Sequence, residues 1–433
     1  MQLKSIKGLY FFGKVCYNKM SEYLLQIGDL PKGMFIMNYD FSNKVSHLQA
    51  SAIREILKFT ADPEVISFAA GNPAPEAFPV ETLTKLSAEI FEEDPILALQ
   101  YSVTEGYTPL RNELKKRLEK DGIFNPDADE LIITSGAQQA NELTAKVMCD
   151  EGDTLVCEAP CFIGSLNAFK SYNVNLCGVT LDPDGINLEE LENVLKGGTV
   201  KLVYLIPNFQ NPTGQTMCLE KRKAVLELAK KYNTVILEDN PYGDLRFAGE
   251  DIPSIKSMDS SGNVVYSGTF SKVLAPGIRV GYAVGPKEII QKIVVCKQVA
   301  DVHSNIWAQV LAYKFLTKCD MDKHLASLRE IYKHKCSLML DEIEKNFSSK
   351  VTCTKPEGGL FIWCTLPSDC DMMSFCSRAV QEYKVALVPG TAFMINETDK
   401  TTSFRVNFST PTDEQIIKGC EMVGKLSKEM FGD

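Results

Sequence analysis

A lysine and an arginine lie seven residues apart near the middle of the chain, and together they could bind an anion. The segment Gly268-Thr269-Phe270-Ser271-Lys272 follows a strand-like run of residues, and Arg279 comes soon after it. Two hydroxyls, an ammonium and a guanidinium this close together suit an anion such as phosphate and leave the lysine free for chemistry. Ser-Lys pairs are also common in solvated loops, so the motif gains weight only from the elements around it.

Polar residues follow three more predicted strands. A glycine turn that opens directly into a helix offers free backbone N–H groups, which is the usual geometry for holding phosphate. The GK[ST] part of a Walker loop is absent from this turn. Each polar residue also has a simpler interpretation, since Asp239 could cap a strand end, Tyr242 could belong to the core and Asn211 could be a turn residue. The residues concerned are Ser135, Gly136, Ala137 and Gln138 in the glycine turn, Asn211 after the second strand, and Asp239 and Tyr242 after the third.

The elements that position these residues alternate between strand and helix from residue 131 onward. Such alternation predicts a mostly parallel sheet covered by helices on both faces, with ligands at the carboxyl ends of the strands. We expect strands at 131–134, 154–157, 174–179, 201–206, 234–238, 263–267 and 280–284, and helices at 80–93, 108–121, 137–150, 162–171, 188–196 and 219–231.

The last third of the chain predicts a second, smaller α+β region. A long helical stretch over 287–318 and a second over 322–347 precede it, and an amphipathic helix over 49–59 is expected to join it. Strands are expected at 351–354, 360–365, 385–388 and 402–407, and helices at 371–383 and 412–430. The predicted domains are 1–40 as an N-terminal extension, 41–75 as a helix and loop joining the small domain, 76–318 as the large domain, and 319–433 as the small domain.

Composition and charge exclude several classes of function. The 433 residues carry a net charge of −10, which argues against nonspecific nucleic-acid binding. The 14 cysteines are scattered without a CxxC pair, which is typical of a reducing cytoplasm, and the four histidines have no metal-ligand spacing. No apolar run reaches the ~20 residues that span a bilayer. We therefore expect a cytoplasmic protein with no metal site.

The polar set at the strand ends suits one cofactor, pyridoxal 5′-phosphate (PLP). PLP forms a Schiff base with a lysine, and it needs a carboxylate that keeps its pyridine nitrogen protonated so that the ring acts as an electron sink. Lys272 and Asp239 would supply these two groups, and the glycine turn would hold the phosphate.

The chain resembles the fold-type-I PLP-dependent aminotransferases of class I/II, the aspartate aminotransferase superfamily, from about residue 42 to about residue 431. The motifs that carry the resemblance are NPTG at 211–214, EDNPY at 238–242, TFSK at 269–272 with Arg279, and RVNFS at 405–409. Within the family it is most similar to the 2-aminoadipate (LysN-like), kynurenine and aromatic aminotransferases. That similarity rests on QASAIREILK at 49–58, ISFAAGNPAPEAFP at 66–79 and EGGLFIW at 357–363.

The resemblance implies a role for each residue of the set. Lys272 would hold the cofactor and move a proton during catalysis, Asp239 would pair with the pyridine nitrogen, and Phe162 would stack on the ring at a position where relatives often have tyrosine. Arg405 would bind the α-carboxylate of the substrate, with a backbone contact from Gly71. The other implied contacts are Tyr242 and Asn211 with the phenolic oxygen of PLP, Ser135, Gly136, Ala137, Gln138, Thr269, Ser271 and Arg279 with its phosphate, and Tyr101 with the phosphate of the neighbouring subunit in a homodimer with shared sites.

Substrate choice is assigned to Arg54. The resemblance implies that this arginine reads the distal carboxylate of glutamate or 2-aminoadipate, although an arginine beside Ile53 could also simply extend to solvent. The predicted reaction moves an amino group from an L-amino acid (2-aminoadipate, aromatic or branched aliphatic) to 2-oxoglutarate by a ping-pong mechanism. The alternatives are a PLP-dependent lyase, since fold alone does not fix the chemistry, and a PLP-binding regulator built on the same domain.

Overall fold

The computed structural model describes residues 39–46, 48, 61–396 and 398–433. The chain forms two compact units, Met1–Ser46 and His47–Asp433, and each is described by itself. The described part of the first unit contains the short helix α2 (Asn43–Ser46), which no buried residue anchors. The helix predicted over 49–59 lies outside the described residues, as does nearly all of the predicted extension 1–40.

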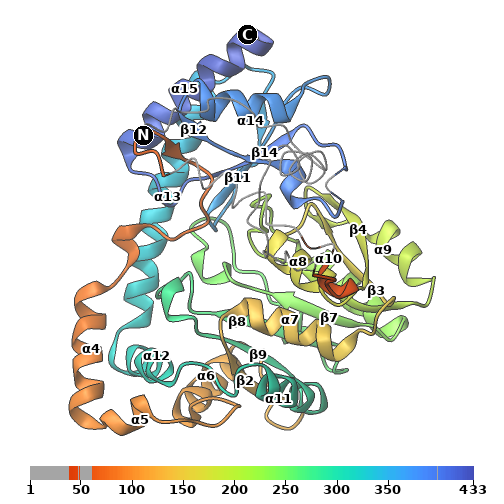
Figure 1. Cartoon of the computed structure of the whole chain (residues 1–433), viewed down its shortest axis with the longest axis vertical. Coiled ribbons are helices and arrows are strands. Elements are labelled where there is room, and N and C mark those ends of the chain that lie inside the picture. The colour runs from red at the N-terminus through yellow and green to blue at the C-terminus, as the bar shows by residue number, and fades with distance from the viewer. Residues whose placement is uncertain (1–38, 47, 49–60, 397) are drawn as a thin grey trace, which may run out of the picture. The chain divides into compact units, whose positions relative to one another are not determined.

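An eight-stranded, mostly parallel sheet forms the centre of the second unit (Figure 1). β9 is antiparallel to both of its neighbours, so β2 and β8 on either side of it run in the same direction, and the short β5 is antiparallel to β4. The carboxyl ends of β2, β8, β7 and β6 therefore meet at one edge of the sheet. The strand order is β2 (Asp129–Thr134), β9 (Gly281–Pro286), β8 (Val264–Thr269), β7 (Val235–Asp239), β6 (Val200–Leu205), β3 (Thr154–Ala159), β4 (Asn175–Asp182) and β5 (Gly185–Ile186).

Helices cover both faces of this sheet because its strands are apolar on both sides. Val203 and Ile236 belong to a core cluster with residues of α9 (Leu188–Leu195) and α10 (Leu219–Lys231). Their neighbours Tyr204 and Leu237 point to the other face, where they join a core with α7 (Ala137–Met148) and α8 (Ile163–Lys170). The prediction of a helix-covered, mostly parallel sheet is confirmed.

The expected continuous helical stretch over 287–318 is interrupted. Its first part packs against α7. The chain forms α11 (Lys287–Asp301) and α12 (Ile306–Lys318) with a break between them. Val302 has a positive φ of 64°, which ends α11, and the Asn305 side chain accepts a hydrogen bond from Ala308 N (3.0 Å), which caps α12. The helices packed against α12 are α4 (Val80–Glu93), α5 (Pro95–Leu99) and α6 (Thr108–Lys120).

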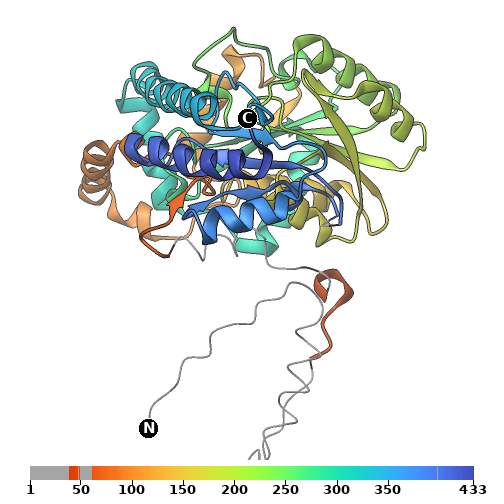
Figure 2. The ribbon, with the colours of Figure 1, turned by 90° about the horizontal axis from the view of Figure 1, so that it is seen from above.

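The C-terminal part of the chain builds a smaller antiparallel sheet flanked by helices, as expected. Its strand order is β10 (Thr352–Cys353), β11 (Phe361–Thr365), β14 (Ser403–Asn407) and β13 (Val388–Pro389). The long helix α13 (Met321–Asn346) runs beside α15 (Asp413–Phe431), and α14 (Met372–Gln381) packs on α15 (Figure 2). β1 (Ile66–Ser67) and β12 (Val385–Ala386) form a separate two-stranded parallel sheet, which ties the residues after 65 to the C-terminal part of the chain.

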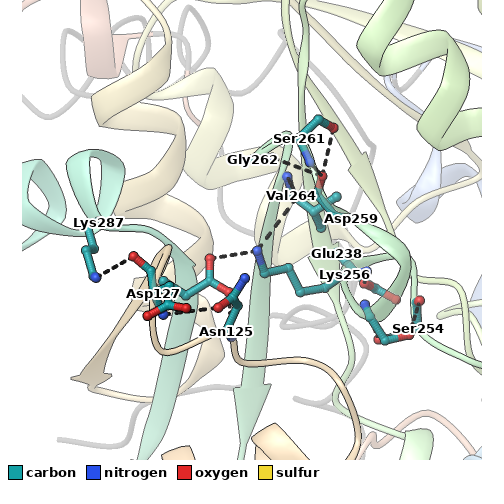
Figure 3. A network of polar contacts seen from close by, with 12 residues as sticks. Asn125, Asp127, Glu238, Ser254, Lys256, Asp259, Ser261, Gly262, Val264 and Lys287 are labelled. Carbon is teal, nitrogen blue, oxygen red and sulfur yellow. Dashed lines mark hydrogen bonds and ion pairs between the residues drawn. The ribbon is translucent and has the colours of Figure 1, made fainter.

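An ion network closes the edge of the central sheet that lies away from the site (Figure 3). Lys256 Nζ lies 2.8 Å from Asp129 Oδ1 at the start of β2 and 3.7 Å from Asp259 Oδ2. The same Asp259 oxygen accepts a hydrogen bond from Val264 N at the start of β8 (2.9 Å). The network therefore anchors the amino ends of two strands. In the described part of the chain no helix is long and apolar enough to cross a membrane.

Candidate active site

A cavity of about 450 Å³ opens at the carboxyl ends of the central strands. Its size is that of a site for a small-molecule ligand. Residues from both sheets line it, since Asp239 and Thr269 end strands of the central sheet and Arg405 lies on β14 of the smaller one. Of the sequence-predicted residues, the cavity brings together Gly71, Ala137, Gln138, Phe162, Asn211, Asp239, Tyr242, Thr269, Ser271, Lys272, Arg279 and Arg405.

Lys272 lies in the turn after β8, and its amine faces the cavity. Its Nζ donates a hydrogen bond to the carbonyl oxygen of Gly71 at 2.8 Å. Burial, together with the nearby guanidinium groups of Arg405 and Arg279, lowers the pKa of Lys272 to about 8. A larger fraction of this amine is therefore uncharged near neutral pH than in an ordinary lysine, which makes it a better nucleophile.

Asp239, the last residue of β7, is buried, and its two oxygens differ in their partners. Its Oδ2 accepts hydrogen bonds from Tyr204 Oη (2.7 Å) and Asn141 Nδ2 (2.8 Å), whereas its buried Oδ1 has no partner among the described residues. Burial raises the pKa of Asp239 to about 6, although the hydrogen bonds from Tyr204 and Asn141 act in the opposite direction. Buried carboxylate oxygens are almost always hydrogen-bonded, so Oδ1 calls for a ligand that donates a hydrogen bond there.

The glycine turn after β2 opens α7 at the cavity. The first N–H groups of a helix have no partner within the helix, and those of Ala137 and Gln138 begin α7 here. Gly136 has a φ of 78°, and a Cβ at this position would lie 2.2 Å from Arg279 Nη2, so only glycine allows the guanidinium this close.

Arg279 and two hydroxyls complete this corner of the cavity. Arg279 Nη2 donates to Ser135 O (3.1 Å), and Nη1 donates to Ser271 Oγ (3.4 Å), which in turn accepts from Thr269 Oγ1 (2.9 Å). Arg279 itself adopts a left-handed backbone conformation with φ 54°. A guanidinium, two hydroxyls and a helix amino end converge here, and this set of donors fits a phosphate group.

Arg405 on β14 is buried between two aromatic rings. Its guanidinium carbon lies 4.2 Å from the ring centre of Phe361 and 4.9 Å from that of Phe393. Nη1 donates to Asn211 Oδ1 and Nη2 to Ala69 O, both at 2.8 Å, while its buried Nε has no partner among the described residues. Burial lowers the pKa of Arg405 to about 10. The side chain is thus a preorganised, incompletely paired cation, which suits a carboxylate ligand.

Tyr242 lies between these groups. It is 5% exposed, and its ring packs edge-on against Phe361, with centroids 5.8 Å apart. Burial raises the pKa of its phenol, so the hydroxyl keeps its proton and can donate it to a ligand oxygen.

Of the predicted site residues that the structure describes, Ser135, Gly136 and Tyr101 do not line this cavity. The Ser135 hydroxyl points away from it toward Asp301 Oδ2 (3.1 Å), so Ser135 contributes its carbonyl oxygen to Arg279 instead. Tyr101 is 82% exposed and packs edge-on against His303. Arg54 lies outside the described residues.

The sequence interpretation missed Asn141, Tyr204, Phe361 and Phe393. Asn141 stands one helical turn after Ala137, a position that faces the same way as the start of α7, and this spacing could have revealed it. Tyr204 is a polar aromatic residue inside an apolar strand, where its hydroxyl needs a partner. Both hold Asp239 Oδ2 and leave Oδ1 for a ligand.

These groups fit PLP. The free Asp239 oxygen matches a protonated ring nitrogen, Lys272 matches the aldehyde, the donors around Arg279 match the phosphate, and Phe162 supplies an aromatic ring in the cavity wall. The residues present are therefore a complete set for this cofactor.

Comparisons with known proteins agree with this site. Residues 63–423 match the family model for aminotransferase class I and II. The aromatic-amino-acid aminotransferase 1 of Thermococcus litoralis is 41% identical over 90% of this chain and 94% of its own length.

Two solved structures carry the similarity into three dimensions. The kynurenine aminotransferase of Pyrococcus horikoshii, in complex with PMP, has a TM-score of 0.87 at 40% identity and covers 90% of this chain and 97% of its own. The alpha-aminoadipate aminotransferase of Thermus thermophilus, complexed with N-(5′-phosphopyridoxyl)-L-leucine, has a TM-score of 0.83 at 36% identity over 90% of this chain and 97% of its own. The predicted branch of the family is confirmed. The chain belongs to the aminotransferase class I and II family, and it is a PLP-dependent transaminase.

Proposed function

We propose that this transaminase moves the amino group of an L-amino acid with an aromatic, branched aliphatic or 2-aminoadipate side chain to 2-oxoglutarate, in two half-reactions of a ping-pong mechanism. The observation that carries the proposal is the Arg405 guanidinium, which lies between Phe361 and Phe393 in the wall of the cavity that holds Lys272. Its buried Nε has no partner among the described residues. A group of this kind binds the α-carboxylate that amino acids and 2-oxo acids share.

When bound, PLP supplies a ring that withdraws electrons from the substrate Cα. Asp239 Oδ1 would hold the proton on the ring nitrogen, and Tyr204 and Asn141 fix the carboxylate in place through Oδ2. Tyr242 and Asn211 would bind the phenolic oxygen of PLP, and the start of α7 with Thr269, Ser271 and Arg279 would bind its phosphate; all of them line the cavity. Lys272 Nζ would take the proton from the substrate Cα, which its lowered pKa favours.

The substrate range rests on the cavity and on the relatives. The names of the relatives include aromatic amino acids, kynurenine and 2-aminoadipate as substrates. Phe162, Ile206 and Phe361 give the described cavity wall an apolar character that suits aromatic and aliphatic side chains. Arg54 would read the distal carboxylate of 2-oxoglutarate and 2-aminoadipate.

We further propose a cytoplasmic homodimer with shared sites. The described cysteines are all free thiols, which fits a reducing compartment. Tyr101 carries an exposed aromatic ring beside exposed Leu99 and Val103, a surface suited to a second copy of the chain. Mixing a Lys272→Ala chain with a Tyr101→Phe chain puts both lesions into one site of the heterodimer and leaves the other site intact. Activity above that of both parents supports the sharing, and activity no higher than theirs contradicts it.

A panel of L-amino acids with 2-oxoglutarate tests the reaction. We expect glutamate to form with aromatic donors and 2-aminoadipate. The absorbance of the bound cofactor should change when the amino donor is added without 2-oxoglutarate, and it should return when 2-oxoglutarate follows. A lyase would instead release ammonia or cleave the donor without needing 2-oxoglutarate, and that result would contradict the proposal.

A further inference from the structure

An ion pair between a buried lysine and a half-buried aspartate lies directly behind the glycine turn that is expected to face the cofactor phosphate. The Lys297 side chain is fully buried on α11, and its Nζ lies 2.7 Å from Asp301 Oδ1 and 2.8 Å from Oδ2. The same amine donates to Gln139 Oε1 at 2.8 Å. Neither side chain lines the cavity, so the reaction itself does not use this pair.

Asp301 accepts hydrogen bonds from both ends of the glycine turn. Its Oδ2 accepts from Ser135 Oγ (3.1 Å) and from Gln139 Nε2 (2.8 Å), and Gln139 Oε1 accepts from Ser135 N (2.8 Å). The residues between these two anchors are those expected to present N–H groups to the phosphate. With its hydroxyl held away from the cavity, Ser135 directs its carbonyl oxygen at Arg279 Nη2 (3.1 Å). One carboxylate thus orients both the start of α7 and the guanidinium.

The backbone at Val302, directly after Asp301, is strained in a way that this role explains. Val302 has φ 64° and ψ −62°, and His303 N donates to Asp301 O at 2.7 Å, which forms a tight γ-turn. This conformation is rare, and it is unfavourable for a β-branched residue. Such strain persists where the surroundings over-determine it, commonly at functional sites. Here the turn places Asp301 against Ser135, and Ser304 Oγ 3.2 Å from the same hydroxyl.

We infer that Asp301, neutralised by Lys297, is a positioning residue for the cofactor phosphate: it holds residues 135–139 and Arg279 in the geometry that binds this group. The inference rests on the assignment of the glycine turn to the phosphate, which is part of the proposed function. It assigns no contact between Asp301 and the cofactor.

The test compares PLP with pyridoxal, which lacks the phosphate but offers the same aldehyde to Lys272. Equilibrium dialysis of the full-length enzyme against graded concentrations of each compound gives two dissociation constants, and their ratio reports the phosphate contribution alone. We expect Asp301→Asn to weaken PLP binding about ten- to a hundredfold and pyridoxal binding less than about threefold. An unchanged ratio would overturn the inference, because a merely structural residue would affect both compounds alike.

Two further variants sharpen the result. Asp129→Asn breaks an equally tight buried pair with Lys256 (2.8 Å) at the far edge of the sheet, so it should lower stability and leave the ratio unchanged. Ser135→Ala removes only one hydroxyl and should move the ratio in the same direction as Asp301→Asn by about threefold, which keeps the test available if Asp301→Asn does not fold. An equal change of the ratio in Asp129→Asn would also overturn the inference.

A wild-type enzyme with no preference for PLP over pyridoxal would refute the phosphate assignment itself. A missing transamination with intact PLP preference would refute only the proposed reaction.

Discussion

Two neighbouring carboxylates on β7 differ in how completely they are paired. Glu238 is fully buried, and its two oxygens accept hydrogen bonds from the N–H groups of Ile255 (2.9 Å) and Lys256 (2.8 Å). Asp239, one residue later and on the opposite face, leaves Oδ1 unpaired among the described residues. The first carboxylate is satisfied by the fold, and the second is complete only with a ligand.

Two lysines at opposite ends of the sheet strands differ in the same way, in how completely their charge is paired. Lys256 lies against the carboxylates of Asp129 and Asp259 (Figure 3). Lys272 instead donates to a carbonyl oxygen, and two nearby guanidinium groups help to lower its pKa. Burial of a charge is costly unless it is paired. The far edge of the sheet therefore stabilises the fold, while the site edge keeps incompletely paired groups that a cofactor and a carboxylate substrate would satisfy.

Of the variants that alter the two carboxylates of β7 or the substrate contact, Asp239→Asn should have the largest effect. A neutral amide cannot hold the proton on the ring nitrogen, so turnover should fall by about two to four orders of magnitude while PLP remains bound. Steady-state kinetics at saturating PLP, with bound PLP measured after alkaline release, checks both parts. Near-normal turnover would show that the free oxygen of Asp239 is not the partner of the ring.

Arg54→Ala extends the comparison from the cofactor to the substrate. The cations that line the described cavity wall are Lys272, Arg279 and Arg405, and each has an assigned partner, so a distal carboxylate needs another cation. Loss of a charge-assisted contact worth about 1.5–3 kcal/mol should lower kcat/KM for glutamate and 2-oxoglutarate by about ten- to a hundredfold. The half-reaction with leucine or phenylalanine should change little, and equal losses for acidic and apolar substrates would assign Arg54 a structural role.

The pH dependence of cofactor attachment tests the environment of Lys272. Its lowered pKa means that the protonated amine, which cannot attack, loses its proton near pH 8 rather than near the ordinary value of about 10.4. The rate of PLP attachment to cofactor-free enzyme should therefore rise about tenfold per pH unit below pH 8 and level off above it. A rate that still rises steeply beyond pH 10 would mean that burial and the two arginines do not act on this amine.

Glu238→Gln should have the smallest effect on chemistry. The amide keeps one acceptor oxygen and loses the charge, so we expect the free energy of unfolding to fall by about 1–3 kcal/mol with no change in the absorbance spectrum of bound PLP. Denaturant unfolding of the holoenzyme and its absorbance spectrum provide the two readouts. A changed spectrum would show that Glu238, like Asp239, acts on the cofactor, and would contradict the different roles given to the two carboxylates of β7.

The sequence predicted the strands and helices of the central sheet well because each has a regular apolar pattern. The prediction was wrong where the conformation of a single residue ends a helix. The positive φ of Val302 divides the expected helical stretch 287–318 into two helices. Short elements with little pattern, such as β1, α5 and β5, were also missed.

For the site, motifs predicted which residues gather in the cavity, but not how each side chain points. The hydroxyl of Ser135 faces Asp301, which is 166 residues away in sequence, and no local signal indicates that contact. The sequence pattern does not indicate Asn141 and Tyr204, because each acts through a hydrogen bond to Asp239 on a different element. Partners distant in the chain become visible only in three dimensions.

The most direct test of the central claim is to reduce the enzyme with borohydride and locate the cofactor by peptide mass spectrometry. The enzyme should be yellow, lose that colour on reduction, and carry one pyridoxyl phosphate adduct on Lys272. The Lys272→Ala variant should carry no adduct and have no measurable turnover. An adduct on any other lysine, or no adduct in the wild-type enzyme, would contradict the assignment of Lys272 and the site built around it.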